Sequence, residues 1–440
     1  MLMRNLKKLA AVVAITTLCP ADPLTEWFSQ PNDQRGEIPG SVLTTEIKSP
    51  EDLKEARLAV WKAYRDGAIQ QGWDKAIPAE PGDLSQWVKN GKIDPRIAEI
   101  GDKKMPYVVL AKGKKPEGGW PVFFCLHGGG GNAQAKGPHS WQVNTREWFA
   151  QMQLTTRVWD SPGLYIIPRM ADDRQGRWYF IWNQIFIDRL TQQAILFNDA
   201  NPDRVYLQGI SEGGYSAFRL GSLMADRWAG SCAMAAAEPI GNAPLENLQH
   251  VAFRCGIGEK DTMFNRVGLA RKYFQELAKL KKNHPGFFKH FYDEQKGRGH
   301  GIDYQDGPAW IAKYTRTTVP GSFYWTVIKQ HGPHRSRLYW LAIDGEHSGL
   351  PLKLTAKSDK SKNTIHLTAT DKEDQPATGV KLRVYLNEQL VDLTKEVVIK
   401  VNGKEAFKGM VKPSMEALIR STAERGDPRQ VFPAQVKLGL

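Results

Sequence analysis

Residues 203–214 constrain the fold of this chain more than any other segment. They read Asp-Arg-Val-Tyr-Leu-Gln-Gly-Ile-Ser-Glu-Gly-Gly, an apolar run that leads into a Gly-x-Ser-x-Gly pattern centred on Ser211. Small residues two before and two after a serine allow a turn so sharp that the hydroxyl is lifted above the end of a strand, and a helix follows at once. The segment therefore predicts a strand, a tight turn at Ser211 and a helix opening at Gly214.

Short apolar runs alternate with amphipathic segments between about residues 105 and 317. The expected strands are 107–111, 121–126, 163–168, 204–208 and 251–256, and the expected helices are 181–198, 214–225, 265–281 and 308–314. Such alternation is typical of a mostly parallel sheet with helices on both faces. After residue 320 the pattern becomes β-rich, with an Asn-Gly hairpin signal at 402–403 and one helix at 414–424.

The predicted fold class is therefore α/β, with a mostly parallel sheet flanked by helices, a helical N-terminal extension and a small β-rich C-terminal domain. We expect a signal peptide over residues 1–21, the extension over 22–99, the α/β domain over 100–318 and the β-rich domain over 319–440. Within the extension, residues 50–66 have the apolar spacing of a helix.

The first 21 residues resemble an export signal. Three cations precede the apolar residues 9–18, and small residues follow. This run is shorter than the ~20 residues that span a bilayer, so we expect a secreted or periplasmic protein without a transmembrane anchor in the mature chain. Although the formal net charge is +13, Lys and Arg are scattered along the chain, so no nucleic-acid partner is expected. The cysteines left after signal removal, Cys125, Cys232 and Cys255, permit at most one disulfide.

A glycine run follows the expected strand 121–126. It reads His-Gly-Gly-Gly-Gly over residues 127–131, which leaves backbone amides uncovered. An acyl-transfer enzyme needs such amides to stabilise the oxyanion of its tetrahedral intermediate. We expect the oxyanion hole to be formed by Gly128, Gly129 and the amide of Glu212. A phosphate-binding loop would require a following Gly-Lys-Ser/Thr, which the sequence lacks.

Two later loops supply a candidate acid and a candidate base. Asp261 follows the strand 251–256, with Glu259 as a local competitor and a surface salt bridge as the other interpretation. His300 lies between two glycines after a later strand that contains His290. The order Ser211, Asp261, His300 is the order of an α/β-hydrolase triad, in which the serine attacks, the histidine moves the proton and the aspartate orients the imidazole.

At these motifs, over roughly residues 100–317, the chain resembles the α/β-hydrolase superfamily. The similarity is greatest to secreted serine esterases of the polyhydroxybutyrate-depolymerase and feruloyl-esterase type and to the catalytic domain of prolyl-oligopeptidase-like enzymes. The resemblance implies an exported serine hydrolase that cleaves small-molecule or polymeric carboxylic esters through an acyl-enzyme. No metal or organic cofactor is expected, since no cluster of His, Asp or Glu has metal-ligand spacing.

Two other functions stay open: a serine peptidase of the prolyl-oligopeptidase type, and a non-catalytic polymer-binding protein. The peptidase family adds an N-terminal propeller, for which residues 22–99 leave no room. The sequence departs from the resemblance at Glu212, where many relatives carry Ala, Met or Gln. This side chain either pairs with a nearby Arg or lies over the acyl pocket. Several aromatic residues are concentrated between Trp141 and Trp182, and Trp310 follows later in the chain. They either line a pocket or pack in the core.

Overall fold

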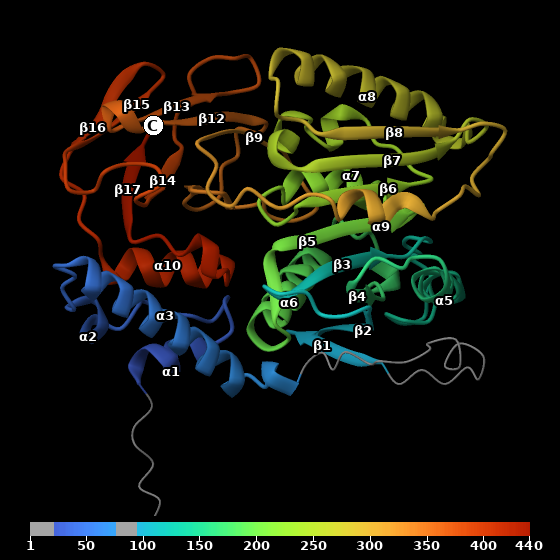
Figure 1. The fold of residues 1–440 in the computed structure, drawn as a ribbon, viewed down its shortest axis with the longest axis horizontal. Coiled ribbons are helices and arrows are strands. Elements are labelled where there is room, and N and C mark those ends of the chain that lie inside the picture. The colour runs from blue at the N-terminus through green and yellow to red at the C-terminus, as the bar shows by residue number, and fades with distance from the viewer. Residues whose placement is uncertain (1–21, 76–94) are drawn as a thin grey trace, which may run out of the picture.

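A computed structural model describes residues 22–75 and 95–440 (Figure 1). Its largest element is an eight-stranded sheet with the strand order β1-β2-β4-β3-β5-β6-β7-β8. The strand β2 is antiparallel to both of its neighbours, and the strands from β4 to β8 run parallel to one another. The strands are β1 (Arg96–Ile100), β2 (Lys103–Lys112), β3 (Trp120–Leu126), β4 (Gly163–Pro168), β5 (Ala200–Ile210), β6 (Gly230–Met234), β7 (Ala252–Gly258) and β8 (His290–Gln295).

Helices cover both faces of this sheet because its central strands are apolar on both sides. In β3, Phe123 and Cys125 belong to the core under α5 (Gln142–Arg157) and α9 (Asp306–Ile311). Val122, Phe124 and Leu126 of the same strand belong to the core under α6 (Ile181–Phe197), α7 (Glu212–Leu223) and α8 (Arg266–Asn283). The predicted α/β fold class is confirmed.

Three elements of this layer were not among those predicted. The strand β6 has the sequence Gly-Ser-Cys-Ala-Met, whose β propensity is low. It becomes a strand because β5 and β7 pair with it on its two sides. The helix α5 begins at Gln142 without a side-chain cap, and β1 begins at Arg96, so the main sheet takes in residues assigned above to the N-terminal extension.

The N-terminal helices are α1 (Pro23–Ser29), α2 (Gly40–Leu43) and α3 (Pro50–Gln70). Ser49 and Asp52 form a capping box at the start of α3, where Pro50 occupies the first turn without losing a hydrogen bond. The helix α3 packs against α1 and against α10 (Met415–Arg425), which is near the other end of the chain (Figure 1).

Two further sheets follow α9. One has the order β16-β15-β13-β12-β9 and the other has the order β10-β11-β14-β17. Their strands are β9 (Ser322–Val327), β10 (Arg337–Leu338), β11 (Leu341–Ile343), β12 (Leu352–Asp359), β13 (Thr364–Thr370), β14 (Lys381–Leu386), β15 (Val397–Val401), β16 (Lys404–Gly409) and β17 (Ala434–Gly439). Asn402 and Gly403 have positive φ between β15 and β16, as the Asn-Gly signal predicted. The apolar side chains of both sheets join the core that lies under α6, α7 and α8.

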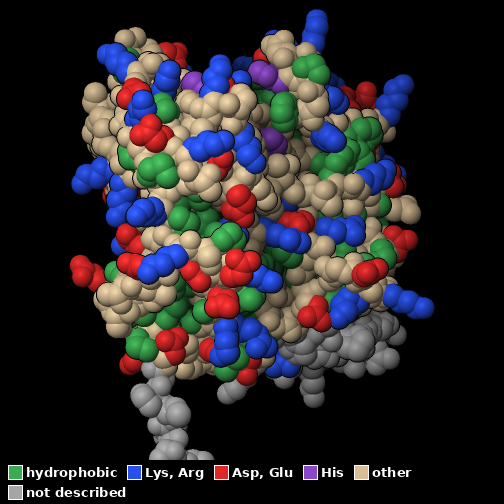
Figure 2. All heavy atoms as spheres, turned by 60° about the vertical axis from the view of Figure 1, so that its left-hand side comes forward, with side chains coloured by type: hydrophobic (Ala, Val, Ile, Leu, Met, Phe, Trp, Pro, Cys, Tyr) green, Lys and Arg blue, Asp and Glu red, His purple; other side chains and the backbone are tan. Residues whose placement is uncertain are grey.

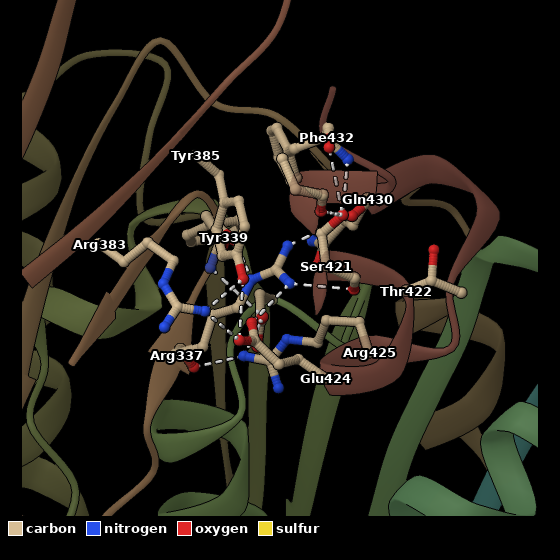
Figure 3. Close-up of polar contacts among 12 residues, drawn as sticks. Arg337, Tyr339, Arg383, Tyr385, Ser421, Thr422, Glu424, Arg425, Gln430 and Phe432 are labelled. Atoms are coloured by element: carbon tan, nitrogen blue, oxygen red, sulfur yellow. Dashed lines mark hydrogen bonds and ion pairs between the residues drawn. The ribbon is translucent and has the colours of Figure 1, made fainter. Parts of the chain in front are cut away.

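Ion pairs also attach the C-terminal strands to α10, and α10 to the main layer. The carboxylate of Glu424, on α10, accepts hydrogen bonds from Arg337, Arg383 and the Tyr385 hydroxyl (Figure 3). Arg425 forms a 2.6 Å ion pair with Asp226, which follows α7 of the main layer. Because both partners are buried, each charge depends on the other for compensation.

Several predictions concern the chain ends, the surface and the cysteines. The predicted signal peptide lies outside the described residues. Within residues 22–75 and 95–440, no helix combines the length and apolarity needed to cross a bilayer. Cationic and acidic side chains are interspersed on the face shown in Figure 2. Cys125, Cys232 and Cys255 are buried free thiols, so the possible disulfide is not formed among them.

Candidate active site

Ser211 occupies the turn between β5 and α7, and its backbone has φ 53° and ψ −113°. A positive φ is strained for a residue with a side chain, and such strain concentrates at functional sites. The turn requires glycine on both sides of it. A Cβ on Gly209 would lie 2.2 Å from the Gly213 carbonyl oxygen, and a Cβ on Gly213 would lie 2.1 Å from that of Leu126. The predicted strand, turn and helix are therefore present around Ser211.

The structure brings the three predicted residues Ser211, His300 and Asp261 into one hydrogen-bonded chain. The Nε2 atom of His300 lies 3.1 Å from the Ser211 Oγ, and its Nδ1 lies 2.7 Å from the Asp261 Oδ2. A carboxylate only accepts, so the His300 Nδ1–H donates to Asp261 and Nε2 is left to accept the Ser211 proton. Asp261 is buried, whereas the His300 side chain is 44% exposed. The serine hydroxyl is thus positioned beside a base that solvent and substrate can reach.

Arg266, which the sequence analysis did not identify, positions Asp261. Its Nη1 donates to Asp261 Oδ1 at 2.8 Å and its Nε donates to the Tyr215 hydroxyl at 2.7 Å. The second carboxylate oxygen of Asp261 is thereby held while the first faces His300. Glu259, the local competitor, instead accepts a hydrogen bond from the Gly297 amide. The structure therefore places Asp261, and not Glu259, against the imidazole.

The glycine loop after β3 lies beside Ser211. A Cβ on Gly128 would be 3.5 Å from the Ser211 Cβ, and Gly129 has φ +95°. Within the described part of the chain, the amides of Gly128 and Gly129 make no hydrogen bond. The Glu212 amide lies in the first turn of α7, where amides lack an intrahelical partner. The Gly130 amide differs, because it donates to the Asn144 side chain. Of the three predicted donors, Gly128 thus lies next to the serine, Glu212 follows it in the chain, and Gly129 follows Gly128.

Buried contacts fix this loop through His127, which the sequence analysis left without a role. Its Nε2 accepts from the Met170 amide at 3.2 Å, so its Nδ1–H donates to the Gly128 carbonyl. Burial lowers the pKa of His127 to about 3, which keeps the ring neutral. Trp178 donates its indole N–H to the His127 carbonyl at 2.9 Å. The conformation of the glycine loop is therefore held by the contacts of His127 with Met170 and Trp178.

The side chain of Glu212 pairs with an arginine, which settles one alternative left open by the sequence. Its carboxylate is only 2% exposed and forms an ion pair with Arg177 Nη1. Burial raises the pKa of Glu212 to about 7, against the opposing effect of the Arg177 guanidinium. Partial burial would lower the pKa of Arg177, but the Glu212 charge raises it.

Part of the aromatic cluster packs in the core. Trp148, Trp159 and Trp178 are buried, whereas Trp182 is exposed.

Among the described residues, no three or more His, Cys, Asp or Glu side chains gather in a way that would hold a metal ion.

Comparisons with known proteins found similarity to solved structures alone. No family model matches this sequence, and no curated protein sequence matches it. Among solved structures, a thermostable esterase is 16% identical, with a TM-score of 0.36 over 50% of this chain and 63% of that chain. A ferulic acid esterase from Anaeromyces mucronatus is 16% identical, with a TM-score of 0.32 over 51% of this chain and 92% of that chain. A carboxylesterase from Mesorhizobium loti is 14% identical, with a TM-score of 0.31 over 49% of this chain and 97% of that chain.

Proposed function

We propose that this chain is a serine hydrolase that cleaves carboxylic esters through an acyl-enzyme. The observation that supports it is the hydrogen-bonded series from Ser211 through His300 to Asp261, set beside unpartnered backbone amides. In this proposal the nucleophile, the base and the oxyanion donors act at one point, as acyl transfer requires.

In the first half of the reaction, the Ser211 Oγ attacks the ester carbonyl carbon and its proton passes to His300 Nε2. The carbonyl oxygen becomes an oxyanion, which the amides of Gly128, Gly129 and Glu212 stabilise. Asp261 stabilises the imidazolium without taking its proton. The intermediate then collapses, the C–O bond to the alcohol breaks, and His300 gives the proton to the departing alkoxide oxygen.

In the second half, water replaces the alcohol. His300 takes a proton from the water, the hydroxide attacks the acyl carbon, and the bond to Ser211 breaks as His300 returns the proton to Oγ. The products are a carboxylic acid and an alcohol, and the enzyme returns to its starting protonation state. No step needs a group beyond the substrate, water and these residues.

The first test measures p-nitrophenol release from acetate and butyrate esters by the purified chain, with a matched pair of serine variants. Ser211→Ala should lower kcat by at least about 10⁴-fold, the scale of triad removal. Ser361→Ala should have no effect, because Ser361 is on the surface and its hydroxyl bonds, among the described residues, to Asp359 alone. A pre-steady-state burst that disappears in Ser211→Ala would support the acyl-enzyme.

The other outcomes separate the competing functions. Hydrolysis that survives Ser211→Ala would place the nucleophile elsewhere. Turnover of peptides but not of esters would favour the serine peptidase, and polymer binding without any turnover would favour a binding protein.

We also propose that the mature enzyme is secreted or periplasmic, because residues 1–21 have the order of cations, apolar residues and small residues that export signals have. Mass spectrometry of the protein from cell fractions tests this. A chain that starts near Asp22 outside the cytoplasm is expected, and an uncleaved cytoplasmic chain would contradict the proposal.

A further inference from the structure

Glu212 and Arg177 form an ion pair directly beside the proposed nucleophile. Glu212 follows Ser211 in the chain, and its carboxylate is buried. The negative charge of Glu212 disfavours an oxyanion nearby and so raises the barrier of the proposed reaction. The presence of the ion pair at this position therefore calls for another role. Simple hydrolysis of a neutral ester does not need it.

The guanidinium of Arg177 lies over the glycine loop. A Cβ on Gly130 would be 3.2 Å from Arg177 Nη1 and 3.8 Å from Glu212 Oε2. The backbone of Arg177 is also held, because its carbonyl accepts hydrogen bonds from Asn183 Nδ2 and the Phe180 amide. The base of this side chain and its charged end are therefore both fixed in place.

Most of the donors of that guanidinium are free. Only Nη1 bonds to Glu212, and the guanidinium makes no other hydrogen bond to the described residues. The side chain is 44% exposed. A fixed guanidinium with an open edge matches a carboxylate in shape and charge, and little side-chain entropy is lost when one binds.

The opposite side of the loop carries the opposite charge. The Glu147 Oε2 atom would lie 2.5 Å from a Cβ on Gly128, the same position that is 3.5 Å from the Ser211 Cβ. Glu147 makes no hydrogen bond or ion pair within the described residues. An anionic group is therefore disfavoured on the Gly128 side. On the Gly130 side the Glu212 charge is paired with Arg177, whose remaining donors can meet an anion.

We propose that Arg177, held by Glu212, binds a carboxylate of the substrate, so that the enzyme prefers esters that carry a carboxylate on their acyl or alcohol part. This inference rests on the proposed ester hydrolysis and names the substrate class of the same site. Arg177 is a binding residue in this scheme, and the reaction steps are unchanged.

The test compares kcat/KM for two pairs of esters, in each of which a carboxylate is free in one member and methylated in the other. On the acyl side these are the 4-nitrophenyl esters of hydrogen adipate and of methyl adipate. On the alcohol side they are the butyrate esters of 4-hydroxybenzoate and of methyl 4-hydroxybenzoate. The wild-type chain should prefer the anionic member of one pair by about tenfold or more, and Arg177→Gln should bring that ratio close to one.

Arg174→Gln is the matched control. Arg174 lies three residues earlier, is also 44% exposed and also pairs with a buried carboxylate, that of Asp172. This control should keep the wild-type ratio. If Arg177→Gln folds poorly, the double variant Arg177→Gln with Glu212→Gln replaces it, because it removes both charges of the ion pair. The same ratio of kcat/KM is then measured. Glu147→Gln should keep or increase the preference.

Two results would overturn the inference: a wild-type ratio of one or less in both pairs, or an equal loss of the ratio in Arg174→Gln and Arg177→Gln. Ser211-dependent turnover of the neutral butyrate esters, measured alongside, reports on the proposed function itself. Its presence with no charge preference would reject the role of Arg177 alone, and its absence would reject both proposals.

Discussion

Two buried carboxylates lie at the proposed reaction centre, and each has an arginine partner. Asp261 pairs with Arg266 and faces His300, and Glu212 pairs with Arg177. A buried carboxylate is costly unless it is paired and hydrogen-bonded. The Glu212 Oε1 atom has no hydrogen-bond partner among the described residues, so its compensation is incomplete.

The incomplete compensation of Glu212 predicts a pH dependence of stability. Burial raises the pKa of Glu212 in the folded chain to about 7, above the ordinary value of 4.5. Between these values the folded protein binds more protons than the unfolded chain, so the wild-type free energy of unfolding falls as pH rises. Glu212→Gln removes the ionising group, so its free energy of unfolding should not fall in this way.

Urea unfolding at pH 5 and pH 8 checks this prediction. The stability of Glu212→Gln relative to wild type should rise between these pH values by up to about 3 kcal/mol, at about 1.4 kcal/mol per unit of pKa shift. Ser211→Ala, which removes no titrating group, should show no such trend. A pH-independent difference for Glu212→Gln would contradict the prediction.

Arg266 should act on the reaction through Asp261. Arg266→Gln removes the donor to Asp261 Oδ1, so the carboxylate orients His300 less firmly. We expect kcat to fall by about tenfold or more, or about 1.4 kcal/mol of barrier, with little change in KM. Steady-state kinetics on the butyrate ester measures this. A change confined to KM would mean that Arg266 contacts substrate instead.

At the scale of elements, the site forms where parallel strands end. Ser211 follows β5, Asp261 follows β7 and His300 follows β8, and the Gly128 loop follows β3. Because parallel strands present their carboxyl ends at one edge of the sheet, loops far apart in sequence meet there. This rule made the approach of Ser211, Asp261 and His300 predictable from their order and context alone.

The close approach of α7 to β3 gives a prediction for the turn. A methyl group on Gly213 would meet the Leu126 carbonyl at 2.1 Å, and Leu126 precedes the glycine loop. Gly213→Ala should therefore displace the loop and abolish ester turnover, with a loss of stability of about 1–3 kcal/mol from overpacking.

Gly241→Ala is the control for this variant. A Cβ at Gly241 has no atom within 4 Å, so its activity and unfolding midpoint should match those of the wild type. Turnover and thermal unfolding of both variants settle the comparison. A fully active Gly213→Ala would show that the loop tolerates displacement.

At the scale of the whole molecule, residues 319–440 share a hydrophobic core with the main sheet. Phe323, Trp340 and Tyr385 belong to the same buried cluster as residues of α6 and α7. The ion pair between Arg425 and Asp226 is also buried between these parts. The Glu424 network of Figure 3 instead joins α10 to the C-terminal strands. We propose that the C-terminal region is a packing partner that folds together with the main layer.

The pair between Asp226 and Arg425 tests this coupling. Burial lowers the pKa of Arg425 to about 9, against the Asp226 charge that raises it. Asp226→Asn leaves a buried guanidinium without its counter-charge, which should cost about 3–5 kcal/mol. Far-ultraviolet circular dichroism should show a single transition at a lower denaturant concentration.

An exposed pair provides the matched control. Asp374 pairs with Lys353 on the surface, so Asp374→Asn should change stability by at most about 1 kcal/mol. If Asp226→Asn instead produced two separate transitions, the C-terminal sheets would be an independently folding domain.

The sequence by itself determined the features that short-range sterics control: the turn at Ser211, the alternation of strands and helices, and the order of Ser211, Asp261 and His300. Small residues around the turn admit few backbone conformations, so local sequence is sufficient there. Tertiary structure alone decided the rest. Among 60 Lys and Arg residues, only packing between segments 35 residues apart determines that Arg177 meets Glu212. The contact of Arg266 with Asp261 spans five residues, but it depends on how the loop after β7 folds onto the start of α8. The same long-range packing makes β6 a strand and merges residues 319–440 into the main core.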